Sequence, residues 1–111
     1  MKPSIKTQSN KADKLFSEII RSKGYCKNCG SKDRLQCAHV FSRKYKQIRW
    51  AFNNAFCLCW KCHIYYTHFP IEWENFAVLK LGRKEYNKLR NKALKYGKLD
   101  YEEILKRLEA I

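Results

Sequence analysis

The sequence contains no continuous apolar run of about 18 residues, the length that a membrane-spanning helix needs. Its N-terminal segment also lacks the apolar stretch of a secretory signal. These absences predict an intracellular, cytoplasmic protein that has no membrane partner. No internal repeat and no low-complexity tract interrupts the 111 residues, so we expect one folded domain over residues 1–111.

Acidic side chains are missing from the middle of the chain. Between Arg34 and Ile71 there is no Asp or Glu, although the whole chain has a net charge of +14. An excess of this size predicts binding to the phosphate backbone of nucleic acids. General solubility and docking on anionic lipid are the alternatives, but concentration of the charge in one region favours nucleic acid. The basic residues expected to contact DNA are Arg43, Lys44, Lys46, Arg49 and Lys61.

Four of the six cysteines form two Cys-x-x-Cys pairs, Cys26 with Cys29 and Cys59 with Cys62. Thiolates at this spacing can close a tetrahedral site around Zn²⁺ with no open position, which predicts a structural zinc ion. Three disulfides are the alternative in a short secreted chain, but the missing signal favours reduced thiols. Cys37 and Cys57 lie outside the zinc spacing, and we expect them to be small buried strand residues.

The apolar pattern divides the chain into four parts. Residues 1–9 are polar and basic and predict a mobile arm; residues 10–24 follow a helical stripe that starts at a possible cap, Asn10. Residues 25–70 hold both cysteine pairs and predict two strands, near residues 35–40 and 55–58, and a helix from Cys59. Residues 71–111 predict further helices, with breaks at Gly82 and Gly97 and a cap at Asp100. The expected fold class is α+β.

One segment carries a family resemblance. Residues 54–63 read Asn-Ala-Phe-Cys-Leu-Cys-Trp-Lys-Cys-His, and a predicted strand that ends in Ala-His precedes them. This order resembles the HNH family of ββα-metal endonucleases, and its layout is similar to phage-encoded members such as the NinG/Rap-like recombination nucleases. The resemblance covers about residues 24–70. It implies a zinc-stapled treble clef whose ββα core carries the chemistry.

The resemblance also implies roles for single residues. His39 would be the general base, Asn54 would orient His39 or ligate a metal, and His63 would hold a divalent cation such as Mg²⁺, Mn²⁺ or Ni²⁺. His68 is a candidate second ligand of that cation. The implied function is a metal-dependent DNA endonuclease that recognises backbone shape more than base sequence. Branched or recombination intermediates are the substrates that the resemblance suggests.

The sequence departs from the family at one position. Many HNH proteins have an Asp immediately before the catalytic His, where this chain has Ala38. Hard cations prefer oxygen ligands, so a non-catalytic zinc-dependent nucleic-acid-binding protein is the alternative function. His63 could also be a fourth zinc ligand in place of Cys62. The pattern does not distinguish a monomer from a homodimer.

Overall fold

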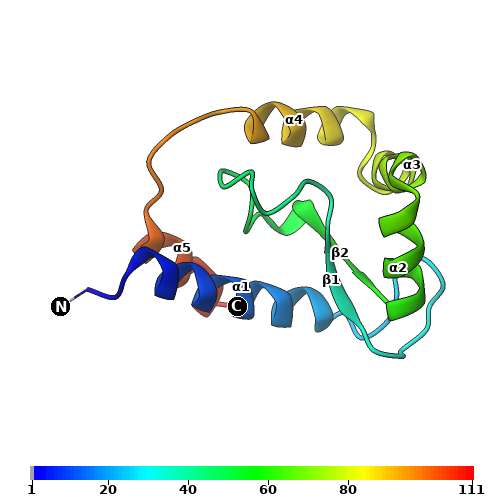
Figure 1. Cartoon of the computed structure of the whole chain (residues 1–111), viewed down its shortest axis with the longest axis horizontal. Helices are drawn as coiled ribbons and strands as arrows, with labels where there is room; N and C mark the ends of the chain where they lie inside the picture. Colours follow the sequence, from blue (N-terminus) through cyan, green and yellow to red (C-terminus); the bar gives the residue numbers. More distant parts are fainter. Residues whose placement is uncertain (1) are drawn as a thin grey trace.

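A computed structural model describes residues 2–111 as five helices around a two-stranded antiparallel sheet, which confirms the α+β class (Figure 1). None of the helices in the described residues is long and apolar enough to span a membrane. The elements in chain order are α1 (Ile5–Arg21), β1 (Gln36–His39), the short 3₁₀ helix η1 (Phe52–Asn54), β2 (Ala55–Leu58), α2 (Trp60–His68), α3 (Pro70–Leu81), α4 (Arg83–Ala93) and α5 (Tyr101–Glu109).

Helix α1 begins earlier than the sequence pattern predicts. Ser4 caps it, because the Ser4 hydroxyl accepts a hydrogen bond from the backbone N–H of Thr7 at 3.1 Å. The prediction of a mobile arm over residues 1–9 and a helix start at Asn10 is therefore corrected: residues 5–9 are helical. The predicted apolar stripe is confirmed, since Ala12, Phe16 and Ile20 are buried.

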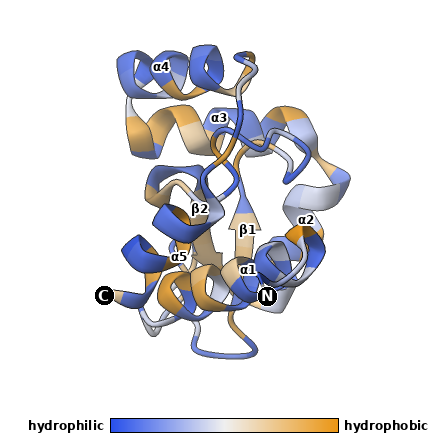
Figure 2. Cartoon of the chain, turned by 90° about the vertical axis from the view of Figure 1, so that its left-hand side faces the viewer, coloured by the Kyte–Doolittle hydropathy of each residue, from blue (hydrophilic) through white to orange (hydrophobic). Residues whose placement is uncertain are grey.

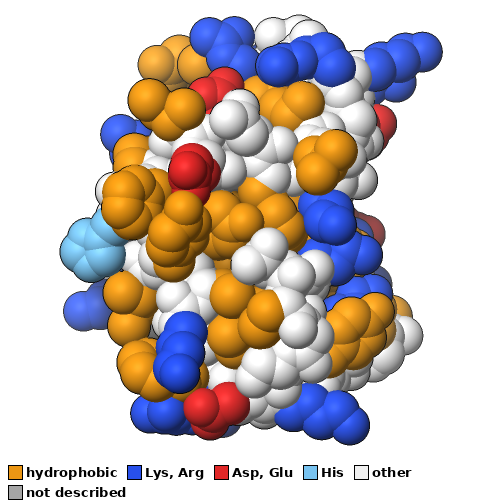
Figure 3. All heavy atoms as spheres, turned by 90° about the vertical axis from the view of Figure 1, so that its right-hand side faces the viewer, with side chains coloured by type: hydrophobic (Ala, Val, Ile, Leu, Met, Phe, Trp, Pro, Cys, Tyr) orange, Lys and Arg blue, Asp and Glu red, His pale blue; other side chains and the backbone are white. Residues whose placement is uncertain are grey.

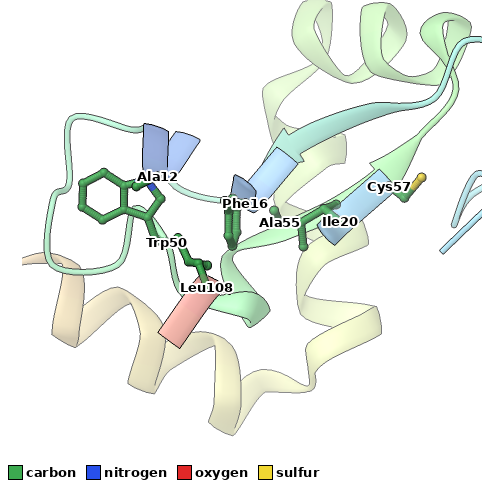
Figure 4. Packing of buried hydrophobic residues seen from close by; sticks show 7 residues of the cluster. All are labelled: Ala12, Phe16, Ile20, Trp50, Ala55, Cys57 and Leu108. Atoms are coloured by element: carbon green, nitrogen blue, oxygen red, sulfur yellow. The ribbon is translucent and has the colours of Figure 1, made fainter. Parts of the chain in front are cut away.

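The sheet separates two buried clusters. Cys37 pairs with Cys57 and His39 with Ala55, so the strands have the predicted bounds within one or two residues. Side chains on one face join α1 and α5 in a core that Figure 4 shows from close by; its buried members are Ala12, Phe16, Ile20, Trp50, Ala55, Cys57 and Leu108. Ala38 and Leu58 face the other way, against the cysteine cluster and Phe76 of α3.

Helices α3 and α4 follow the sheet in the chain, and α5 then brings the chain back to α1. Pro70 occupies the first turn of α3, and Gly82, with φ of 87°, separates α3 from α4. Helix α4 ends at Ala93, before the predicted break at Gly97. The Asp100 carboxylate caps α5 by accepting the Glu103 N–H at 3.1 Å, as predicted. Helix α5 then packs against α1, so residues from both ends of the chain share one core.

Candidate functional site

The four predicted zinc ligands come together in space. The Sγ atoms of Cys26, Cys29, Cys59 and Cys62 all lie within 4.8 Å of one another. Those of Cys29 and Cys59 are 3.7 Å apart, close to the edge of about 3.8 Å that follows from a tetrahedron with Zn–S bonds of about 2.3 Å. The cluster can therefore hold a structural metal ion such as zinc. Cys62 completes the set, so His63 is not needed as a zinc ligand.

Backbone hydrogen bonds position both halves of the cluster. The Gly30 N–H donates to the Cys26 carbonyl at 2.9 Å, and Gly30 has a φ of 81°, which closes the first Cys-x-x-Cys pair as a tight turn. The Lys27 N–H donates to the Cys57 carbonyl at 2.8 Å and ties this turn to β2. Cys59 is the N-cap of α2. The second pair is thus carried on a helix N-terminus, whose dipole stabilises thiolates.

The thiols differ in how readily they ionise. Burial opposes ionisation of Cys26, but hydrogen bonds from the backbone of Cys29, Cys59 and Asn28 lower its pKa to about 7. Burial raises the pKa of Cys62 to about 12, against a hydrogen bond from the Asn28 amide. Four thiolates at this separation repel one another strongly. A cation at the centre of the cluster offsets that repulsion and favours the thiolate form of all four.

A separate cleft brings the two predicted catalytic histidines to one place. It has a volume of about 420 Å³, and the residues that line it are Asp13, Ser17, Cys37, His39, Arg43 and His63. His39 comes from β1, His63 from α2 and Arg43 from the loop after β1. Helix α1 forms a further wall of the cleft and contributes Asp13, which the sequence pattern does not connect with this site.

His39 is held at three points. Its Nε2 lies 3.1 Å from the backbone carbonyl of Arg49, and its ring centroid lies 5.4 Å from that of Phe16. The indole N–H of Trp73 donates to the backbone carbonyl of His39 at 3.1 Å. A carbonyl oxygen only accepts, so Nε2 carries the hydrogen of the neutral ring and Nδ1 has the free lone pair.

Burial of His39 also affects its charge. Desolvation lowers its pKa below the ordinary 6.5, although the Arg49 carbonyl acts in the opposite direction. The neighbouring guanidinium of Arg43 lowers the pKa further. The imidazole is therefore mainly neutral near pH 7, the form in which it can accept a proton.

The His63 ring is oriented by a strand residue. Its Nδ1 lies 2.5 Å from the side-chain Oε1 of Gln36, the first residue of β1. The amide oxygen only accepts, so Nδ1 carries the hydrogen and Nε2 keeps its lone pair. Burial lowers the pKa of His63. A neutral imidazole with one nitrogen anchored in this way is the usual form of a histidine metal ligand.

Asn54 has a different contact from the one expected. It is fully buried, and its Oδ1 accepts the Phe41 N–H at 2.8 Å while its Nδ2 donates to the carbonyls of Phe41 and Ile48, both at 3.1 Å. The side chain thus binds the backbone of the loop after β1 instead of the His39 imidazole or a metal. Its effect on His39 is indirect, because this loop includes Arg49, whose carbonyl bonds His39.

Asp13 fixes the same loop from the other side. Its carboxylate accepts hydrogen bonds from Arg49 Nε at 3.0 Å, from Arg49 Nη2 at 2.5 Å and from the indole N–H of Trp50 at 2.9 Å. The guanidinium of Arg43 lies 3.6 Å away. Arg49 is consequently committed to Asp13 and only 18% exposed, which corrects the prediction that it contacts DNA. Asp13 could not be found from spacing, because it lies on α1, far from the motif in sequence.

The remaining predicted site residues lie on the surface. Lys44, Lys46 and Lys61 are exposed, as a phosphate contact requires. His68 is exposed at the end of α2 and does not line the cleft that contains His63. Its predicted role as a second cation ligand therefore has no support from its position.

Helices α2 and α3 form a face of different character. In Figure 3 apolar side chains gather across its middle and Lys and Arg side chains lie mainly toward its edges. The exposed apolar residues of α2, α3 and their junction include Ile64, Tyr65, Phe69 and Ile71. Tyr66, by contrast, packs on Trp73 and Phe76. This composition does not suit a phosphate backbone, so the basic loop after β1 is the better candidate for a nucleic-acid contact.

Comparison of the chain with protein-family models, with curated proteins and with solved structures finds no match. Among residues 2–111, the four cysteines are the one group of three or more His, Cys, Asp or Glu side chains close enough to hold a metal ion. The structure therefore supports a metal centre of four cysteines and, beside it, a cleft with two oriented histidines.

Proposed function

We propose that this chain is a metal-dependent DNA endonuclease of the HNH type. The observation that carries the proposal is the meeting of His39 and His63 in one cleft, each with one ring nitrogen anchored and the other left with a lone pair. The net charge of +14 and the exposed loop lysines favour DNA as the substrate.

In the proposed reaction His39 acts as the general base. Nδ1 of His39 takes a proton from a water molecule, and the water oxygen forms a bond to phosphorus. The bond from phosphorus to the leaving oxygen breaks, and this oxygen keeps the electron pair and takes a proton from solvent water. The proton moves to His39, which the Arg49 carbonyl stabilises in its charged form through Nε2. Asp13 and Asn54 position the loop that presents this carbonyl. They are positioning residues, not catalytic ones.

His63 would hold the divalent cation through Nε2, with water and the substrate phosphate as further ligands. Mg²⁺, Mn²⁺ and Ni²⁺ are the candidates, and such an ion supplies positive charge against the phosphate. A nitrogen ligand suits Mn²⁺ and Ni²⁺ better than Mg²⁺. Arg43, whose side chain is 62% exposed at the cleft, is placed to contact the same phosphate.

One observation favours a second candidate function, a zinc-dependent nucleic-acid-binding protein without catalysis. The carboxylate of the cleft, Asp13, is already bonded to Arg49 and Trp50. Asp13 therefore does not replace the oxygen ligand that an Asp in place of Ala38 would offer to a cation. In this second reading His39 and His63 would line a binding surface only.

Plasmid cleavage separates the two functions. Zinc-loaded protein is incubated with supercoiled plasmid, and with a four-way DNA junction, under Mg²⁺, Mn²⁺ or Ni²⁺. The endonuclease proposal expects His39→Ala to lose cleavage by a factor of about 10² to 10⁴ while it binds the DNA as wild type does. His68→Ala is the matched control and should cleave normally. Equal cleavage by wild type and His39→Ala, or none by either, would contradict the proposal.

A further inference from the structure

The linker between α4 and α5, residues 94–100, exposes an aromatic ring completely. Tyr96 is 100% exposed, so its ring contributes nothing to any buried cluster. Lys95 and Lys98 lie on either side of it in the sequence. Figure 1 shows the linker as a long stretch without helix or strand that connects α4 to α5. An aromatic side chain among lysines is the combination that binds unpaired nucleotides, because the ring stacks on a base while the lysines contact the backbone.

The lysine pattern continues along α4. Lys84, Lys88 and Lys92 recur every fourth residue and are all exposed, so they form one stripe along the helix. Figure 2 shows α4 as largely hydrophilic. Its buried residues are Tyr86, Leu89 and Ala93. Like charges at this spacing weaken an isolated helix. A polyanion bound along the stripe would relieve the repulsion.

This surface is joined to the loop that reaches the cleft. The Gln47 side-chain N–H donates to the Gly97 carbonyl at 2.9 Å, and Lys46 and Lys98 line the same surface groove. Ile48 packs against Leu89 and Ala93 of α4. Arg43, at the start of this loop, lines the cleft that contains His39. The loop therefore connects the cleft with the linker and contributes Arg43 and Lys46, while the groove is also lined by Asp100, Glu102 and Glu109.

We propose that α4 and the linker form a second DNA contact, in which the lysines bind the backbone and Tyr96 stacks on an unpaired base. The inference rests on the proposed function and names its substrate class: duplex DNA that continues into an unpaired strand. In a continuous duplex the flat faces of the bases are covered by their neighbours, so Tyr96 has no partner there. Duplex would occupy the cleft and the basic loop, and the unpaired strand would pass over the linker.

The test measures DNA affinity of the full-length zinc-loaded protein by fluorescence anisotropy. The two probes are a blunt duplex of about 20 base pairs and the same duplex with a thymidine tail of about 10 nucleotides, a length within the range of single-strand binding sites. Wild type should bind the tailed probe more tightly. Tyr96→Ala should lose about fivefold or more in affinity for the tailed probe and keep its affinity for the blunt one. Its thermal melting curve should match wild type, because the side chain is fully exposed.

Three further variants test the stacking itself. Tyr96→Phe keeps the ring and should bind as wild type, whereas Tyr96→Leu keeps apolar bulk without the ring and should bind as Tyr96→Ala. Tyr25→Ala is the matched control, since Tyr25 is half-exposed and also lies near lysines, Lys23 and Lys27, but outside this surface. It should bind both probes as wild type.

The outcomes separate this inference from the nuclease proposal. Equal affinity of wild type and Tyr96→Ala for the tailed probe would overturn the second contact, as would an equal loss on both probes or full binding by Tyr96→Leu. These results leave the plasmid assay unaffected. Conversely, tail binding that depends on Tyr96 in a protein that cleaves nothing would support the DNA contact and refute the nuclease.

Discussion

The cysteine cluster and the histidine cleft meet at the first turn of α2, and they differ in how much of their chemistry the protein supplies. Cys59 and Cys62 complete a set of four identical donors, all within 4.8 Å. His63, the next residue, belongs to a cleft with two imidazoles, an exposed arginine and a carboxylate that is already paired. The first site needs only a metal ion. The second needs a cation, a water molecule and a phosphate before any reaction can occur.

The two sites therefore have different roles in the molecule. The cluster joins the turn after α1 to the start of α2, and so fixes where α2 begins. Gln36 of β1 then sets the rotation of the His63 ring. In our account the metal centre is a scaffold and the cleft is the functional site.

The largest effect is expected from loss of the cysteine-bound metal. Binding of a structural zinc ion contributes apparent free energies of about 10 kcal/mol or more in small domains. Chelation, or Cys59→Ser, should therefore unfold the chain, as measured by circular dichroism. Cys37→Ala is the control, because Cys37 lies outside the cluster and should leave the fold intact. A native spectrum after complete metal removal would refute the scaffold role.

Asn54→Ala should cause the next largest loss. The substitution removes three hydrogen bonds and leaves the partly buried N–H and carbonyl of Phe41 without their partner, whereas the Ile48 carbonyl keeps its bond from the Ala51 N–H. We expect a cost of about 3 kcal/mol in the free energy of unfolding, measured by urea denaturation. The neighbouring Asn53→Ala removes only one exposed bond, to Glu85, and should cost less than about 0.5 kcal/mol. Similar losses for the two variants would contradict the role assigned to Asn54.

Asp13→Ala should have a smaller but measurable effect. The substitution removes the hydrogen-bond partner of Arg49 and Trp50. Because the Asp13 side chain is only 20% exposed, we expect the free energy of unfolding to fall by about 2 kcal/mol. Cleavage should also fall, because the Arg49 carbonyl that bonds His39 loses its support. Glu18→Ala removes an exposed carboxylate from the same helix and serves as the control. Unchanged stability and cleavage in Asp13→Ala would rule out this positioning role.

The smallest effect is a displacement of the pH profile. Only neutral His39 can accept a proton, so cleavage should increase as pH rises through its pKa. Burial lowers that pKa, so the midpoint of kcat/KM should lie below 6.5. The folded protein also disfavours protonated His39, so this residue reduces stability as pH falls below 6.5. A midpoint above 6.5 would contradict the assignment of His39 as the buried base.

The cysteine site could be predicted from the sequence because its ligands come in two local pairs. The same holds for both strands, since the alternation over residues 35–40 and the short apolar run over residues 55–58 agree with the structure. Local rules also located the end of α3 at Gly82 and the Asp100 cap of α5. In each case the information lies within a few neighbouring residues. The start of α1 was missed because its cap, Ser4, precedes a polar turn that shows no apolar stripe.

The cleft could be predicted only in part, since its geometry depends on residues far apart in the chain. Asp13 reaches it from α1, and Trp73 holds the His39 backbone from α3. Arg49 looked like a DNA contact because its sequence neighbours are basic, but the three-dimensional position of Asp13 decides its role. The partners of Asn54 are backbone groups, which leave no signal in the sequence.

The most direct test of the account is a paired measurement on His63→Ala. Its zinc content and its plasmid cleavage are determined on one preparation, with wild type and His68→Ala beside it. The account predicts about one zinc ion per chain, bound by the four cysteines as in wild type, and cleavage reduced by at least about 100-fold. Loss of zinc together with the fold would show that His63 belongs to the metal scaffold. Retained zinc with wild-type cleavage would show that the cleft is not the site of the reaction.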